Sequence, residues 1–443
     1  MEVTLQQILD ARERRAALQK ALLAEFRCPL ICFTMNIAGP VKVSPLILRA
    51  FQWGLDRLDS RLQEAKILYR QADTPITGCE AFLAVAADAL ILKDICTSIE
   101  EETPLGRLFD MDVLGCDGHK LDRKNQRGCI VCGAPGRACA AGRLHSAKQL
   151  QDVTGRILSA HFAAIDRDKI ATLAVKSLIA EVHTTPKPGL VDRRNTGSHK
   201  DMDIRTFTAS AFALEPYFRK CVETGQNTAL LSPAKTFSLL RQAGLDAEKA
   251  MYKATGGINT HKGAIYTMGV LCGAVGRLWK PEAPIAKTDE ILCLCKEMTA
   301  QSVKDDFAAM TGATAGERLY LQKGLTGIRG QVAAGLPAVA HIGLPVYKSC
   351  LQNGLSDNDA GAVTLVHLIA QVEDTNLHHR GGTDGAAFAR DAARMLLPAP
   401  AMAQIEELDN AFIVRNLSPG GCADLLAVTY FLHHLEQTTR SLN

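Results

Sequence analysis

The feature that most constrains the fold is a change of pattern near Asp166. Before this residue, short apolar runs with strand composition alternate with helix-like segments. After it, strand signals end, and long runs carry apolar residues at helical spacing. The sequence therefore predicts two domains, a mixed α/β domain at residues 1–165 and an all-α domain at residues 166–443, each long enough for its own core.

Periodicity, capping residues and turn residues predict the individual elements. In the first domain we expect helices at residues 4–26, 45–71 and 90–101 and strands at residues 29–37, 82–87 and 108–114, with a turn at 115–118 and a short return strand. In the second domain we expect helices at residues 168–182, 204–221, 233–253, 262–278, 288–305, 360–374, 388–395 and 422–435. Several glycines fall within residues 262–278, which indicates that helices approach closely there.

The segment from Glu181 to Asp203 is predicted to be a structured loop, because prolines and glycines interrupt regular structure. It mixes cations with carboxylates. Cations can hold phosphate oxygens, and carboxylates can hold Mg²⁺ or move a proton, so the loop suits a metal-bound polyphosphate. A solvated run of charges is the alternative. The predicted phosphate-binding residues are Lys187, Arg193, Arg194 and Lys200, and the predicted carboxylates are Asp192 and Asp201.

Other loops of the second domain are also charged and rich in glycine. The stretch at residues 254–263 opens a predicted helix, where free backbone N–H groups bind phosphate and a first-turn lysine is explained by an anion. Each loop alone is a weak signal, since a glycine pair is often only a turn and residues 373–374 could be a solvated helix end. The predicted phosphate- or nucleotide-binding residues here are Gly256, Gly257, His261, Lys262, Arg318 and Arg380, and the predicted carboxylates are Glu317, Asp374 and Asp424.

In the first domain, the chemistry lies on the predicted strand at residues 108–114. Asp110 and Asp112 are two residues apart, so their carboxylates point to one face of a strand. Two such charges repel unless a cation lies between them, and Mg²⁺ shared with a polyphosphate is the natural candidate. Arg107 could contact phosphate. An edge strand with two solvated aspartates is the alternative.

A cysteine cluster follows this strand. Cys129, Cys132, Cys139 and His145 are the ligand types of a Cys₃His zinc site, and a metal-free cysteine loop is the alternative. The sequence has fourteen cysteines, and the others lie in apolar stretches. Most are therefore expected to be buried thiols in a reducing cytoplasm. The N-terminus does not resemble a signal peptide, no long apolar run predicts a membrane span, and a net charge of +3 does not indicate a nucleic-acid binder.

The first domain resembles apo-citrate lyase phosphoribosyl-dephospho-CoA transferase. The resemblance rests on Phe33-Thr-Met-Asn-Ile-Ala-Gly-Pro-Val-Lys42, on Pro104-Leu-Gly-Arg-Leu-Phe-Asp-Met-Asp-Val-Leu114 and on the cysteine cluster. It implies a nucleotidyltransferase-like fold. It also implies transfer of a phosphoribosyl-dephospho-CoA group to a serine of the citrate lyase acyl carrier protein, its gamma subunit, with release of pyrophosphate.

The second domain resembles triphosphoribosyl-dephospho-CoA synthase. The matching motifs include Thr185-Pro-Lys-Pro-Gly-Leu-Val-Asp-Arg-Arg-Asn195, residues 374–382 and Arg415-Asn-Leu-Ser-Pro-Gly-Gly421. The resemblance implies that ATP and 3′-dephospho-CoA give 2′-(5″-triphosphoribosyl)-3′-dephospho-CoA and adenine, the former being the substrate of the first domain. Prosthetic-group synthesis for malonate decarboxylase and a zinc-containing interaction module without catalytic activity are the alternatives.

Overall fold

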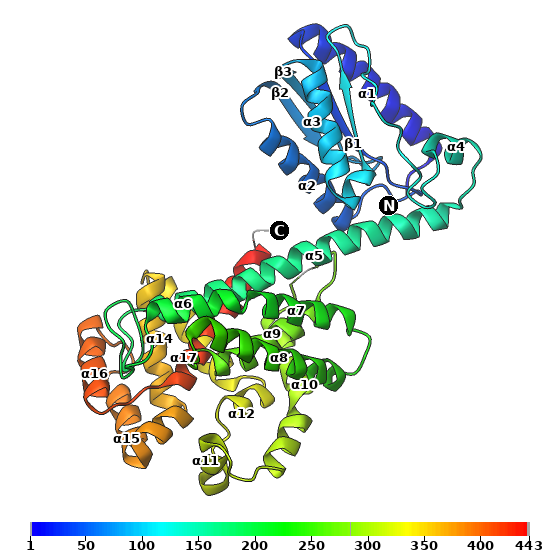
Figure 1. Ribbon diagram of the computed structural model, residues 1–443. Coiled ribbons are helices and arrows are strands. Elements are labelled where there is room, and N and C mark those ends of the chain that lie inside the picture. Colours follow the sequence, from blue (N-terminus) through cyan, green and yellow to red (C-terminus); the bar gives the residue numbers. More distant parts are fainter. Residues whose placement is uncertain (1, 284, 441–443) are drawn as a thin grey trace. The chain divides into compact units, whose positions relative to one another are not determined.

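The computed structural model describes residues 2–283 and 285–440, which divide into two units, Met1–Ala164 and Ile165–Asn443 (Figure 1). One helix, α5 (Ala147–His183), continues through the boundary between them. No helix within the described residues is both long enough and apolar enough to cross a membrane.

The N-terminal unit is built on a four-stranded antiparallel sheet with the order β2-β3-β1-β4 (Figure 1). The first four residues of the inner strand β1 are apolar and buried because both faces are covered, with Leu22 of α1 against one face and the Phe51 ring of α2 against the other. The elements are α1 (Leu5–Phe26), β1 (Leu30–Met35), α2 (Pro45–Arg61), β2 (Lys66–Asp73), β3 (Glu80–Ala86), α3 (Ala89–Glu102), the 3₁₀ helix η1 (Pro104–Leu108), β4 (Phe109–Leu114) and α4 (Gly136–Ala141).

Most elements predicted for this unit are present, including the capping box of Thr4 and Gln7 at the start of α1. The helix predicted at residues 45–71 is wrong in its second half, because α2 ends at Arg61 and residues 66–73 form β2. That strand lies at the sheet edge with alternating exposure, so tertiary pairing with β3 overrides its helical pattern. The predicted return strand is a single bridge between Leu114 and Lys120.

The C-terminal unit is helical, and no strand occurs in its described part. It comprises the end of α5, then α6 (Ile204–Ala213), α7 (Glu215–Asn227), α8 (Pro233–Thr255), α9 (Lys262–Leu278), α10 (Thr288–Ala308), α11 (Ala315–Lys323), α12 (Gly327–Ala333), the π helix η2 (Val339–Gly343), α13 (Leu344–Gln352), α14 (Asp357–Gln371), α15 (Thr375–Met395), α16 (Met402–Val414) and α17 (Gly420–Arg440).

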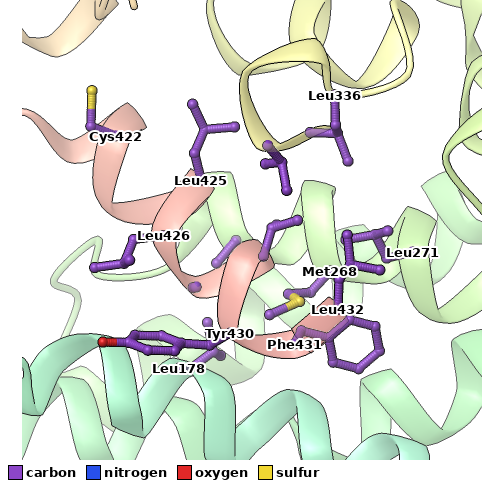
Figure 2. Packing of buried hydrophobic residues seen from close by; sticks show 14 of the residues in the cluster. Leu178, Met268, Leu271, Leu336, Cys422, Leu425, Leu426, Tyr430, Phe431 and Leu432 are labelled. Carbon is purple, nitrogen blue, oxygen red and sulfur yellow. The ribbon is translucent and has the colours of Figure 1, made fainter. Parts of the chain in front are cut away.

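The core of this unit surrounds α17 and α9. Figure 2 shows Leu425, Phe431 and Leu432 of α17 together with Met268 and Leu271 of α9, and all of these side chains are buried. The predicted reason for the glycines of α9 is confirmed, since a Cβ on Gly276 would lie 2.2 Å from the carbonyl oxygen of Val222 in α7. The two helix backbones therefore meet at a distance that only glycine permits.

The helix predictions for this unit differ from the structure in several places. The predicted helix at 204–221 is two helices, because α6 ends before Leu214 and Pro216 lies in the first turn of α7. The predicted loop start is also wrong, since Glu181 lies in α5 and the loop begins at Thr184. The predicted helix at 388–395 is the last part of α15, which bends at Gly382. The helices α11, α12, α13 and α16 were not predicted, and α11 buries no residue that would show a core pattern.

Two candidate active sites

The C-terminal unit contains a cavity of about 820 Å³ whose walls come from helix ends that are far apart in sequence. The C-terminal end of α5, the N-terminal ends of α9, α12, α15 and α17, and the loop after α5 all contribute. Its charged and polar lining includes Glu181, Lys187, His199, Glu248, His261, Lys262, Arg329, Glu373, Asp374, Asn376, His379, Arg380 and Asp424. The cavity therefore gathers several of the loops that the sequence marked separately.

Asp192 holds the loop after α5 in shape. Its buried carboxylate accepts hydrogen bonds from the backbone N–H groups of Lys187 at 3.1 Å, Arg194 at 2.7 Å and Asn195 at 3.0 Å. These bonds use its oxygens within the loop, and Asp192 does not line the cavity. Its geometry is that of a structural residue rather than of the predicted reacting carboxylate.

Lys187 is the one predicted cation of this loop that lines the cavity. The residue is 1% exposed, and its ammonium group lies 2.5 Å from a carboxylate oxygen of Glu181, which is also buried. Burial raises the pKa of Glu181, and the charge of Lys187 opposes that shift. The two side chains form a nearly neutral pair in the cavity wall. The sequence alone does not predict this pair, because it joins the end of helix α5 to the loop that follows.

The other charged residues predicted in this loop lie outside the cavity. Arg193 donates to Thr185 and to Asn358, and Arg194 pairs with Glu406. Lys200 and Asp201 are exposed. For these residues the alternative of a solvated or structural charge fits the geometry better than phosphate binding.

The carboxylates of the cavity differ in how they are used. Asp374 caps α15, because its oxygens accept the N–H groups of Asn376 at 2.7 Å and Cys422 at 2.8 Å. Asp424 in the first turn of α17 has neither a hydrogen bond nor an ion pair within residues 2–283 and 285–440. Burial, followed by the nearby charges of Glu181 and Asp374, raises the pKa of Asp424 well above its usual value. Asp424 is thus a carboxyl group poised to take or hold a proton.

The N-terminus of α9 forms the wall facing Asp424, since a Cβ on Gly263 would lie 1.9 Å from an oxygen of that carboxyl group. The side chain of Asn259 accepts the N–H of Lys262 at 3.2 Å, and the ammonium group of Lys262 lies 2.9 Å from Glu248. The glycines predicted to cradle phosphate, Gly256 and Gly257, instead terminate α8 with positive φ and do not line the cavity.

Two other predicted loops differ in whether their charged residues reach the cavity. Glu317 accepts the N–H groups of Gly312 and Ala313, and Arg318 donates to the carbonyl oxygens of the same two residues, so both stabilise the start of α11 outside the cavity. Arg380 does line the cavity, where its guanidinium group bonds the backbone oxygen of Asn416 at 2.9 Å. Arg329, Glu248 and Asn376 were not among the predicted site residues, although they line the cavity.

The N-terminal unit has a second cavity of about 980 Å³, lined by Asp110 and Asp112 of β4. These residues pair with Thr34 and Cys32 of β1, so they point to the same face of the sheet, as predicted from their spacing. Phe109, Met111 and Val113 face the core on the other side. Within the cavity, partial loss of hydration and then the charge of Asp112 raise the pKa of Asp110.

Cations surround this aspartate pair. The ammonium group of Lys120 lies 2.5 Å from Asp112, and buried Lys93 donates to the backbone oxygen of Met111. Arg123 and Arg127 also line the cavity, and both pair with buried Glu100. Four of these cations are not among the predicted site residues, because they become neighbours only in the fold: Lys93, Lys120, Arg123 and Arg127. The predicted phosphate ligand Arg107 lines the same cavity and donates to the backbone oxygen of Gly128.

The cysteine cluster lies beside this cavity. The ligand atoms of Cys129, Cys132, Cys139 and His145 all lie within 4.8 Å of one another. The Cys132 sulfur is 3.4 Å from the Cys139 sulfur and 3.2 Å from Nε2 of His145. Three thiols and an imidazole at these separations could hold one metal ion.

Comparison with known proteins relates each unit to a family. Residues 167–442 match the family described as ATP:dephospho-CoA triphosphoribosyl transferase, and residues 3–161 match apo-citrate lyase phosphoribosyl-dephospho-CoA transferase. The chain is 36% identical to Protein CitXG of Haemophilus influenzae, over 97% of this chain and 96% of that protein. It is 31% identical to Protein CitXG of Leuconostoc mesenteroides subsp. cremoris, over 98% and 97%. Its C-terminal part is 43% identical to the 2-(5''-triphosphoribosyl)-3'-dephosphocoenzyme-A synthase of Pectobacterium atrosepticum, over 58% of this chain and 86% of that protein.

The two units and their matches define a bifunctional transferase. The chain belongs to the CitXG family, in which an apo-citrate lyase transferase and a triphosphoribosyl-dephospho-CoA synthase are joined in one polypeptide. The predicted activities are thereby confirmed, and the family concerned is that of citrate lyase rather than malonate decarboxylase. The alternative of an interaction module without catalytic activity is wrong.

Proposed function

We propose that Asp424 is the general base of the synthase reaction. One observation supports this choice among the predicted carboxylates. Asp192, Asp374 and Glu317 are occupied by backbone hydrogen bonds, and Asp201 is exposed outside the cavity. Asp424 lines the cavity with oxygens that no described residue occupies, and its raised pKa makes it a stronger base than an exposed aspartate.

In the proposed reaction, the bond from C1′ of the ATP ribose to N9 of adenine breaks, and its electron pair goes to the purine. The 2′-oxygen of dephospho-CoA bonds to C1′, and its proton passes to Asp424. The sugar carries positive charge in the transition state, by analogy with glycoside hydrolysis. The carboxylates of Asp424 and Glu181, which line the same cavity, are suited to stabilise that charge.

We propose that Lys262, Arg329 and Arg380 hold the triphosphate, since all three are cations of the cavity lining. Mg²⁺ bound to the triphosphate would neutralise further charge. Lys187 is better suited to position Glu181, because these two paired groups are buried, whereas the pair of Lys262 with Glu248 is partly exposed. The direct test is incubation with ATP, dephospho-CoA and Mg²⁺, followed by mass analysis for adenine and for the triphosphoribosyl product.

For the N-terminal unit we propose nucleotidyltransferase-type chemistry with Asp110 and Asp112 as Mg²⁺ ligands. The carboxylate oxygens of both residues are available to a metal ion. Asp110 has no hydrogen bond or ion pair within the described residues, and Asp112 has only its ion pair with Lys120. A bound Mg²⁺ would neutralise charge on the polyphosphate. Lys93, Lys120, Arg123 and Arg127 supply positive charge around the pyrophosphate that leaves. The acceptor is a serine of the acyl carrier protein, for which we propose the gamma subunit of citrate lyase.

We propose that the cysteine cluster holds a structural Zn²⁺, because four ligand groups meet there and would leave no open position. Protein purified without chelator is expected to contain about one equivalent of zinc by elemental analysis. Cys132→Ser should lose most of it, while Cys116→Ser, which changes an exposed cysteine outside the cluster, should keep it. Zinc-free wild-type protein would contradict the assignment.

Fourteen cysteines without a disulfide among them also support a reducing compartment such as the cytoplasm.

We propose that each unit folds and works alone. The first part of α5 belongs to the N-terminal unit and packs against that unit through His161. The centroid of the His161 ring lies 4.8 Å from that of the Trp53 ring. The part that belongs to the C-terminal unit is held by Asp166, which accepts a hydrogen bond from Trp279 at 2.8 Å. Each cavity is lined by residues of one unit. Fusion would then serve to keep the intermediate near its second site at high effective concentration.

Fragments 1–164 and 165–443 are therefore expected to be active separately. The second should release adenine from ATP and dephospho-CoA, and the first should label the carrier when supplied with purified intermediate. Circular dichroism reports whether each fragment folds. A folded but inactive fragment would mean that a site needs residues from the other unit.

A further inference from the structure

His261 has an unusual place in the synthase cavity. It lies at the N-cap of α9, is 4% exposed and lines the cavity. Its Nδ1 is 2.8 Å from the hydroxyl oxygen of Ser210 in α6. Its Nε2 is buried and has no hydrogen-bond partner among residues 2–283 and 285–440. A buried ring nitrogen without a partner costs stability unless a ligand satisfies it.

The hydroxyl groups beside His261 determine which ring nitrogen carries the proton. Thr260 donates its hydroxyl hydrogen to Ser210 at 2.7 Å. The Ser210 hydroxyl, which is fully buried, is then free to donate its own hydrogen to Nδ1 of His261. With Ser210 as the donor to Nδ1, the imidazole proton is on Nε2, and this residue would then offer a hydrogen-bond donor to a ligand in the cavity.

The surroundings of His261 suit a neutral, flat ligand better than phosphate. Burial, and then the charge of Lys187, lower the pKa of His261 to about 3, so the ring is uncharged near neutral pH. The Phe207 ring packs edge-on at 5.1 Å. An uncharged imidazole offers no charge attraction to a phosphate, which the cationic side chains of the same cavity supply instead. A purine ring nitrogen is a neutral acceptor that fits beside an aromatic ring.

Building on the proposed role of Asp424, we propose that Nε2–H of His261 donates a hydrogen bond to a ring nitrogen of the adenine that leaves. When the C1′–N9 bond breaks, the electron pair moves into the purine, and a donor at a ring nitrogen stabilises that charge. His261 does not give up its proton, and the departing adenine takes a proton from water. His261 is thus a substrate-contacting residue that favours purine departure, which refines its predicted role as a phosphate- or nucleotide-binding residue.

The test compares wild-type protein, His261→Phe and His261→Gln with ATP and with 1-, 3- and 7-deaza-ATP, in which a C–H group replaces one ring nitrogen. The measurement is kcat/KM for release of the base. In the wild type, the analogue lacking the contacted nitrogen should react more slowly by roughly tenfold or more. The penalty of an analogue is the factor by which its kcat/KM falls below that of ATP with the same protein. His261→Phe keeps a ring but has no donor, so the penalty of that analogue should shrink by at least about fivefold. His261→Gln restores an N–H donor and should recover part of the penalty.

Comparing the penalty of each analogue between the variant and the wild type cancels the intrinsic difference between the bases as leaving groups. His341→Phe changes an exposed histidine outside the cavity and should leave every penalty as in the wild type. If all three penalties are the same in His261→Phe and wild type, His261 contacts no purine nitrogen and the proposal is wrong. If His261→Phe does not fold, as judged by circular dichroism, His261→Leu, which also has no donor, carries the comparison. The result does not depend on Asp424 being the base, whose failure would show as full activity of Asp424→Asn.

Discussion

Asp424→Asn is expected to lower adenine release by roughly 10²–10⁴-fold, because an amide cannot accept the proton of the attacking hydroxyl. The substitution keeps the size of the side chain, which matters because a carboxyl oxygen of Asp424 packs closely against Gly263. The measurement is the rate of adenine release with ATP and dephospho-CoA. Transfer of purified intermediate to the carrier protein should be unchanged, since that reaction uses the other cavity.

Asp201→Asn is the matched control for this experiment. Asp201 was also a predicted carboxylate, but it is exposed and does not line the cavity, so its loss should change adenine release by less than about twofold. Comparable losses in both variants would contradict the choice of Asp424. So would an Asp424→Asn enzyme with near-normal kcat.

Asp110→Asn and Asp112→Asn are each expected to lower labelling of the carrier protein by at least about 10³-fold, since a bound metal contributes several kcal/mol to stabilising charge. Adenine release should stay normal, because the two aspartates lie in the N-terminal unit. The measurement is the mass increase of the carrier with purified intermediate as donor.

Asp73→Asn provides a control on the same sheet. Asp73 is an exposed residue at the end of the edge strand β2 and does not line the cavity. Its substitution should leave labelling unchanged. If Asp110→Asn or Asp112→Asn labels the carrier at a near-normal rate, the aspartate pair is not a metal site. The pair would then be a charged strand balanced by Lys120.

Local patterns were sufficient for part of the fold. The paired spacing of Asp110 and Asp112 required that both point to one face if residues 108–114 formed a strand, and the register with β1 bears this out. The glycines of α9 likewise marked a close helix approach before the partner was known. These features depend on neighbours within one element, which is the range over which sequence periodicity acts.

Edge position and helix breaks were harder to predict. Residues 66–73 continue a helical pattern and become a strand because β3 offers a hydrogen-bonding edge. The short helix α11 buries no side chain, so it lacks the apolar stripe by which helices are predicted.

The sequence by itself determined the family, the two activities and the set of charged loops, because these are properties of motifs that lie within short stretches. Only the tertiary structure decided which members of that set share a cavity. Asp192 and Asp424 have the same side chain, yet backbone N–H groups occupy the first and leave the second free. Lys187 and Lys262 are both cations, yet only Lys187 is buried against a carboxylate. Burial, pairing and pKa follow from contacts between residues distant in sequence, and such contacts exist only after folding.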